Sequence, residues 1–203
     1  MRRRGEPGGP HSSLSWVGRV SSENPGGVSM GLDQNQFRKV MGLRPAGVTV
    51  VTTSDGAGRT WGLTATAVCG VSLEPPLLLV CIDREADCHS AFLETQGFAV
   101  NLLRRDQEEL SRRFASKDPR KFEGVAFRAG ITGAPVMTNV LATMECRMVA
   151  RYPGGDHTIF VGQVISCAAP PGEEVGSPLL YFRGDYTGVA NRLPADVSSP
   201  RSG

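Results

Sequence analysis

The stretch that decides the fold is residues 47–64, which run GVTVVTTSDGAGRTWGLT. Its first half is rich in β-branched residues and predicts a strand over 47–53. Residues 54–58 follow with Asp-Gly turn chemistry, and residues 59–64 return as the partner strand. Such a hairpin is antiparallel, so we expect the sheet of this protein to be built from antiparallel pairs.

Outward from this hairpin, apolar runs predict further strands at about 77–82, 98–103, 142–151, 158–167 and 178–182. Short helices are expected from Asp33 to Met41, from about Cys88 to Thr95, and from Asp106, as a capping residue, to Phe114. Strands and helices do not alternate as in a doubly wound sheet. The fold class expected is therefore mainly β, an antiparallel Greek-key-like barrel with peripheral helices, because closure removes exposed strand edges. Residues 65–72 are small and receive no element, and residues 117–133 are expected to be irregular.

The length of 203 residues suits one medium domain, which we assign to residues 31–190. Residues 1–30 are rich in Gly, Pro, Ser and Arg and are expected to be a disordered extension, and residues 191–203 a frayed tail. An export signal is the alternative for the first 30 residues, but the apolar run Leu14–Val17 is too short for one. Met30 is an alternative start.

The charge balance argues against a nucleic-acid binder. The net charge is +2, from 22 basic and 20 acidic residues. Four arginines and two glutamates fall in residues 1–30, which leaves 18 residues of each sign from Gly31 onward and no basic stripe. No apolar run is long enough for a membrane span. The five cysteines show no Cys-x-x-Cys pair, so we expect free thiols, no metal site and a cytoplasmic location.

Familiar catalytic motifs are absent from the sequence. It contains no Gly-x-Gly-x-x-Gly after a strand, no P-loop and no Gly-x-Ser-x-Gly elbow, which disfavours a Rossmann site, a nucleotide triphosphatase and a serine hydrolase. Thr64–Val68 is the most informative stretch, because small residues let the backbone approach a flat ligand; the alternative is a tightly packed core loop. A basic run around Phe114–Ser116 suits either a phosphate clamp or a solvated helix end; it consists of Arg112, Arg113, Lys117, Arg120 and Lys121. His157 lies at a predicted hairpin, where a lone histidine is more often structural.

Six motifs together resemble the short-chain flavin reductases of two-component monooxygenase systems, which have the FMN-binding split-barrel fold. The resemblance runs from about Phe37 to Val189. The motifs stand in the family's order at residues 37–52, 62–67, 71–77, 100–103, 155–162 and 179–186. Each alone is weak, whereas six in order are specific.

The resemblance implies roles for individual residues. The flavin would be lined by Thr64, Ala65, Thr66, Ala67, Val68, Ser72, Cys81, Ile82 and Cys88, and its phosphate end held by Phe114, Ala115, Ser116 and Lys117. His157 would lie at the nicotinamide and is the one catalytic residue implied, with Phe182, Arg183 and Tyr186 covering the pyridine nucleotide. The family often has Ser or Thr where Cys81 and Cys88 stand, so this chain has thiols in place of those hydroxyl groups.

The implied activity is hydride transfer from NADH or NADPH to FMN or FAD, with reduced flavin passed to a partner monooxygenase. The resemblance also implies a homodimer with the flavin near the subunit interface. A non-catalytic flavin-binding or flavin-delivery protein on the same fold is the alternative, and a split-barrel oxidase of a pyridoxal-type vitamer is a third. Deletion of residues 1–29 is expected to leave turnover intact.

Overall fold

The structure is a computed structural model that describes residues 31–170 and 176–189. The chain divides into two units, Met1–Asp33 and Gln34–Gly203, and the account below concerns the second. The expected extension over 1–30 and the expected tail over 191–203 lie outside the described residues. No helix among the residues described is long and apolar enough to cross a membrane.

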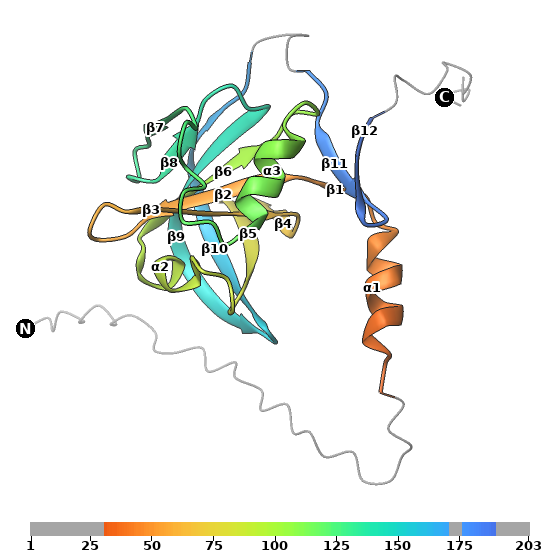
Figure 1. The fold of residues 1–203 in the computed structure, drawn as a ribbon. Helices are drawn as coiled ribbons and strands as arrows, with labels where there is room; N and C mark the ends of the chain where they lie inside the picture. Colours follow the sequence, from red (N-terminus) through yellow and green to blue (C-terminus); the bar gives the residue numbers. More distant parts are fainter. Residues whose placement is uncertain (1–30, 171–175, 190–203) are drawn as a thin grey trace, which may run out of the picture. The chain divides into compact units, whose positions relative to one another are not determined.

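A seven-stranded antiparallel sheet forms the body of the protein (Figure 1). Its strands, in the order in which they pair, are β3 (Thr60–Ala65), β2 (Thr49–Ser54), β6 (Gly97–Leu102), β9 (Ala142–Gly154), β10 (His157–Ala168), β5 (Pro76–Asp83) and β4 (Val68–Leu73). The hairpin predicted from residues 47–64 is present as β2 and β3, with Thr49 opposite Ala65 and Ser54 opposite Thr60. The antiparallel barrel is therefore confirmed.

The two edges of this sheet are joined by the chain itself. Edge strand β3 ends at Ala65 and edge strand β4 begins at Val68, so only Thr66 and Ala67 separate them. A link this short spans at most about 10 Å, because an extended chain advances ~3.3–3.6 Å per residue. The sheet must therefore curl until its edges meet, and the junction of β3 and β4, which we call the seam, marks the closure.

The barrel interior is filled by the inward side chains of its strands. Val51, Val80, Val100 and Phe160 are fully buried there. Gly162 is needed on β10, because a Cβ at that position would lie 2.6 Å from the ring of Phe98. This tight packing holds the strands in place, and with them the backbone positions from which outward side chains line a surface site.

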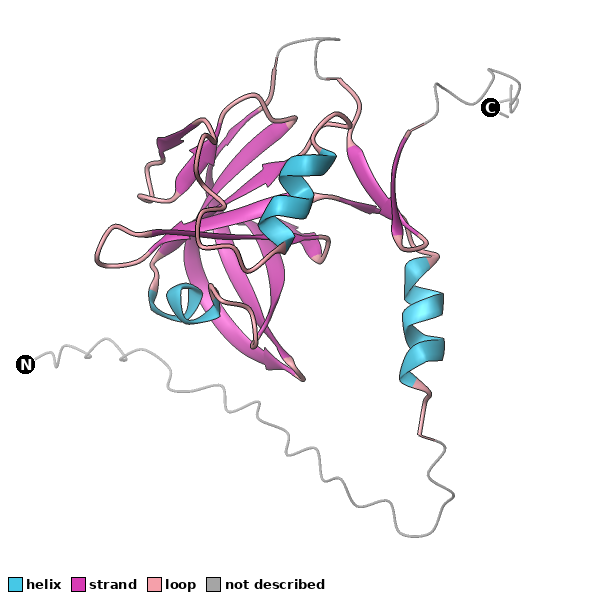
Figure 2. Ribbon diagram, viewed as in Figure 1, coloured by secondary structure: helices cyan, strands magenta, loops and turns pink. Residues whose placement is uncertain are grey.

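Three helices complete the fold (Figure 2). α2 (His89–Glu94) inserts Phe92 into the barrel core, and α3 (Glu108–Ala115) buries Ser111 and Phe114. α1 (Gln34–Gly42) is amphipathic but buries none of its residues in the single chain. Phe37, Val40 and Met41 on α1 are exposed, which leaves an apolar helix face that no other described residue covers.

Two small sheets accompany the barrel. β1 (Ala46–Gly47), β11 (Leu179–Phe182) and β12 (Asp185–Gly188) form one, and β7 (Phe127–Ala129) with β8 (Pro135–Met137) forms the other. Asn101 on β6 ties the second to the barrel: its amide nitrogen donates to Val50 O at 2.9 Å and its oxygen accepts from Met137 N at 2.8 Å.

The structure adds elements to those expected from the sequence. Residues 68–73 form the edge strand β4, β7 and β8 lie in and just beyond the stretch expected to be irregular, and β12 follows β11 as a hairpin. Asp106 does not cap α3; its carboxylate bonds the Arg104 guanidinium, and the N-cap is Gln107.

Candidate functional site

The seam presents backbone to solvent through small side chains. Ala65 is buried, Thr64 and Thr66 are half-buried, and Ala67 is exposed. β3 pairs only with β2 and β4 only with β5 among the described strands, so each has one free edge. Free edges carry unpaired N–H and C=O groups, which can bond the polar rim of a flat ring.

The seam is fixed to α3 from one side. The Thr64 hydroxyl donates to Ser111 O at 2.6 Å. A Cβ on Gly62 would lie 3.1 Å from the Phe114 ring and 3.2 Å from the Phe122 ring, so β3 packs directly on both aromatics. Phe114 is buried, while Ala115, Ser116 and Lys117 at the end of α3 are exposed. The end of α3 is therefore held beside the first residues of the seam.

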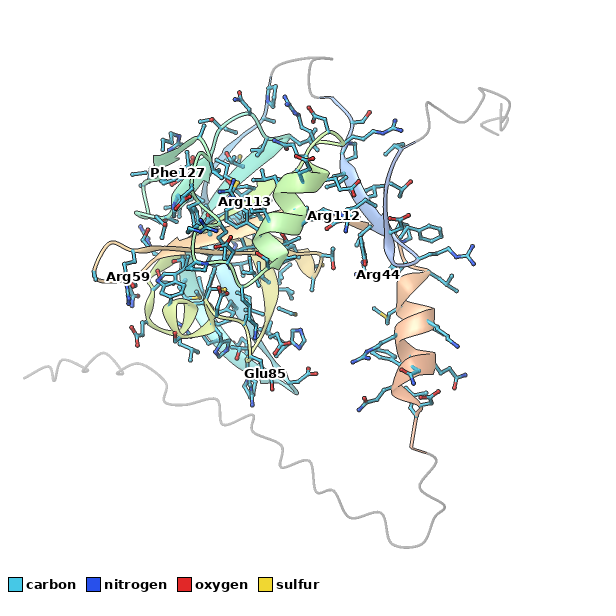
Figure 3. The ribbon with its side chains drawn as sticks, viewed as in Figure 1. Arg44, Arg59, Glu85, Arg112, Arg113 and Phe127 are labelled. Carbon is cyan, nitrogen blue, oxygen red and sulfur yellow. The ribbon has the colours of Figure 1, made fainter. Side chains whose placement is uncertain are left out.

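The basic run at the end of α3, of which Figure 3 labels Arg112 and Arg113, is mostly engaged in local contacts. Arg112 pairs with Glu108 at 2.7 Å, and Arg113 donates to the carbonyls of Arg120 and Glu123, which holds the following loop. The Ser116 hydroxyl donates to Arg113 O at 2.7 Å. The role of Ser116 and Lys117 at a phosphate stays a prediction.

A cavity of about 460 Å³ opens beside β3 just before the seam. Lys121, only 5% exposed, donates to Gly62 O at 3.2 Å and to Asp87 Oδ2 at 2.8 Å inside its wall. Trp61 forms another part of the wall, and its indole N–H donates to Asp55 at 3.0 Å. The pKa of Asp55 falls to about 2, chiefly because of this hydrogen bond.

Sequence analysis did not single out Asp55, Trp61 or Asp87 and treated Lys121 only as part of the basic run. The available signal was Trp61-Gly62, which directly precedes the small-residue stretch.

Two of the thiols predicted to lie near the flavin differ in burial: Cys81 is half-buried and Cys88 is buried. Cys81 lies on β5, and its N–H donates to Ala67 O at 3.0 Å, which places it next to the seam. Burial raises the pKa of the Cys81 thiol. Burial, followed by the charge of Asp87, raises the pKa of Cys88 to about 12. Neither thiol ionises near neutral pH, so neither is a ready nucleophile.

The remaining residues predicted to line the flavin fall into two groups. The side chains of Ile82 and Cys88 lie in the barrel core. Val68 and Ser72 are half-buried on β4. Contact of any of these with a ligand stays a prediction.

His157 begins β10 and lies opposite Asp83, the last residue of β5. Its Nδ1 lies 2.7 Å from Asp156 Oδ1, and this hydrogen bond lowers the pKa of the Asp156 carboxyl. The His157 side chain is 38% exposed. Arg84 N donates to Asp156 O at 3.1 Å, which couples the hairpin tip to the end of β5.

Tyr186 is tied to α3, the helix that also holds the seam. Its hydroxyl lies 2.9 Å from Ser111 Oγ, and the Arg112 guanidinium lies over its ring at 4.8 Å. Phe182 is half-buried in the same hairpin, where Arg183 has φ of 55° and donates its N–H to Gly42 O. The hydrogen bonds described for this chain connect Tyr186 to the seam through Ser111 and Thr64, whereas the side-chain hydrogen bond described for His157 reaches only Asp156.

Comparison with known proteins gives a consistent result. Residues 41–190 match the family model described as flavin reductase like domain. The chain is 46% identical over 157 residues to a flavin reductase (NADH) of Kitasatospora aureofaciens, covering 76% of this chain and 81% of that one. It is 36% identical to the flavin-dependent monooxygenase reductase subunit HsaB of Mycobacterium tuberculosis, covering 80% and 86%.

A solved structure supports the same likeness. The Streptomyces globisporus NADH:FAD oxidoreductase SgcE6, in complex with NAD and FAD fragments, superposes with a TM-score of 0.73. It is 37% identical, and the match covers 81% of this chain and 96% of that one. The matched family region contains the seam, α3, the β9–β10 hairpin and the β11–β12 hairpin.

Proposed function

The chain belongs to the flavin reductase like domain family, and on that premise we propose that it is the reductase component of a two-component flavin-dependent monooxygenase system. It oxidises NADH and reduces free flavin, FMN or FAD, which then leaves for the monooxygenase. The observation that carries this proposal is the seam, where small residues on two free strand edges lie within the matched region. Such an edge suits a flat heteroaromatic ring.

The flavin supplies the redox chemistry: when bound, it accepts a hydride at N5 from the reduced nicotinamide. The residues of the chain hold the flavin ring and the nicotinamide ring in contact and in the orientation that hydride transfer requires. We assign the flavin ring to Thr64–Val68, with Ser72 and Cys81 beside it. Ala65 and Ala67 suit this role because their methyl side chains are small enough to let a flat ring approach the main chain.

The nicotinamide side is assigned to His157, Phe182, Arg183 and Tyr186. His157 suits a positioning role, since Asp156 fixes Nδ1 and leaves Nε2 for a carboxamide or phosphate oxygen. Hydride transfer moves no proton at the reacting carbon, so no general base is required. His157 therefore orients the ring and does not need to transfer a proton.

A homodimer is part of the proposal. Val71 and Leu73 on β4 are exposed, as are Val40 and Met41 on α1. Exposed apolar residues on an edge strand and on an amphipathic helix are costly in a monomer, and a second copy of the chain would cover them. The free thiols of all five cysteines suit a reducing compartment, and we propose the cytoplasm.

The test is a steady-state assay with purified protein. NADH oxidation at 340 nm is expected only when FMN or FAD is added, and the four flavin–nucleotide pairs rank the preferences. A purified monooxygenase with no reductase of its own should gain activity when this chain, NADH and flavin are supplied together. A protein that binds flavin but never oxidises NADH or NADPH would instead be the non-catalytic flavin-binding protein.

A further inference from the structure

Ser111 is a polar residue in a fully buried position of α3. It lies on the helix face that also buries Phe114, three residues further along the chain. A buried hydroxyl group costs free energy unless it is hydrogen-bonded, and alanine would occupy the same place in a helix without that cost. The contacts of the Ser111 hydroxyl are therefore the reason to look for a role beyond packing.

The main chain of Ser111 contacts the flavin side of the proposed site. Its carbonyl oxygen accepts a hydrogen bond from the Thr64 hydroxyl at 2.6 Å. Thr64 belongs to β3 and begins the stretch assigned to the flavin ring. Two residues earlier, a Cβ on Gly62 would lie 3.1 Å from the Phe114 ring. α3 is therefore fixed against β3 at two points, Ser111 and Phe114.

The side chain of Ser111 contacts the nicotinamide side of the proposed site. Its Oγ lies 2.9 Å from the Tyr186 hydroxyl. Tyr186 lies on β12, which among the described strands pairs only with β11, so the hairpin has one free edge. The Arg112 guanidinium lies over the Tyr186 ring at 4.8 Å and is itself held by Glu108 at 2.7 Å. α3 thus holds the β11–β12 hairpin through the ring and the hydroxyl of one tyrosine.

We propose that Ser111 is a positioning residue for hydride transfer, which fixes the place of the nicotinamide ring relative to the flavin ring. The inference rests on the proposed function, in which Thr64 lies at the flavin and the hairpin carries Phe182 and Arg183 at the pyridine nucleotide. Because Ser111 is fully buried, it acts through Tyr186 and not by contact with either ring. Hydride transfer depends steeply on the alignment of the two rings, so a small shift of the hairpin slows the reaction.

The two hydrogen bonds of Ser111 can be separated by mutation. Ser111→Ala removes the hydroxyl that binds Tyr186 and keeps the carbonyl that accepts from Thr64. The flavin side therefore stays in place in this variant, while the hairpin loses one of its contacts with α3. Tyr186→Phe removes the same hydrogen bond from the other partner and keeps the aromatic ring beneath Arg112.

The experiment measures hydride transfer and flavin binding separately. Anaerobic stopped flow with saturating NADH gives the rate of flavin reduction from the loss of flavin absorbance. Quenching of flavin fluorescence without NADH gives the dissociation constant of FMN. The variants are Ser111→Ala, Tyr186→Phe and the double variant. Tyr181→Phe, which removes a phenol hydroxyl from the same hairpin, and Ser90→Ala, which removes an exposed hydroxyl from α2, are the matched controls.

We expect Ser111→Ala to slow flavin reduction about tenfold and to change the dissociation constant of FMN less than about twofold. Tyr186→Phe should have the same effect. The double variant should be no slower than either single variant, because all three lack the same hydrogen bond. Tyr181→Phe and Ser90→Ala should keep the wild-type rate of reduction.

Three results would overturn the inference. An unchanged rate of reduction in Ser111→Ala would show that the hydrogen bond does not position the hairpin. Equal losses of reduction rate and FMN affinity, together with a fall in Tm, would make Ser111 purely structural. A double variant in which the two single effects multiply would mean that Ser111 and Tyr186 act independently. Each result is obtained with wild-type protein that reduces flavin, whereas an inactive wild-type protein would refute the proposed function itself.

Discussion

Removal of the Asn101 side chain should destabilise the protein by about 3 kcal/mol. Asn101 is fully buried and makes three hydrogen bonds with its amide: to Val50 O, to Thr52 Oγ1 and from Met137 N. In Asn101→Ala the Met137 N–H loses this acceptor in a dry environment, which costs ~1–3 kcal/mol. The two lost donations and the small cavity add about 1 kcal/mol more.

The measurement is urea denaturation followed by circular dichroism, together with thermal unfolding. For a chain of this size ~3 kcal/mol corresponds to a fall in Tm of roughly 6–12 °C. Gln96→Ala is the control, because Gln96 is exposed and its side chain has no hydrogen bond described here; its effect should stay within about 0.5 kcal/mol. If Asn101→Ala costs less than about 1 kcal/mol, the amide does not hold β8 against the barrel as described.

Three further outcomes are expected. His157→Ala should raise the KM for NADH about tenfold with little change in flavin affinity, and equal loss of both would contradict its assignment to the nicotinamide. Gly162→Ala should cost ~1–3 kcal/mol in urea denaturation, because the new Cβ meets the Phe98 ring at 2.6 Å, while Gly70→Ala, with open space around it, should be nearly neutral. Burial lowers the pKa of His89 from 6.5, so the unfolded chain binds more protons and the free energy of unfolding falls as pH drops below about 6.5; His89→Gln should reduce that slope.

Sequence patterns predicted the strands that carry strong local signals. The hairpin over residues 47–64 combines β-branched runs with an Asp-Gly turn, and it appears as β2 and β3 with the expected pairing. β4 was not predicted, because Val68–Leu73 contains Cys, Gly and Ser and has little apolar alternation. Its strand conformation comes from pairing with β5, a contact that local sequence does not encode.

The candidate site was predicted only in part, because some of its contacts join residues that are far apart in the sequence. Thr64–Val68 carries a visible composition signal and lies at the seam. Lys121 and Asp87 are 34 residues apart, and neither differs locally from surface charges around it. Their pairing depends on how the loop after α3 folds back onto β3, so it becomes visible only in three dimensions. The family resemblance, and no local pattern, assigned Lys117 to the phosphate together with Phe114, Ala115 and Ser116, and that assignment stays a prediction.

The two-residue link between β3 and β4 also bears on which mutations affect the seam. Recognition by main-chain groups tolerates many side chains, so substitution scans across Thr66 and Ala67 will understate the importance of the segment. Insertion of a single residue is a different event: it would leave the pairing of β4 with β5 unchanged, because the turn after Leu73 sets that register, but it would lengthen the link and let the two edges of the sheet move apart. Libraries that vary the length of the link should therefore change ligand binding more than libraries that vary its side chains, because they alter the spacing of the main-chain groups at the seam.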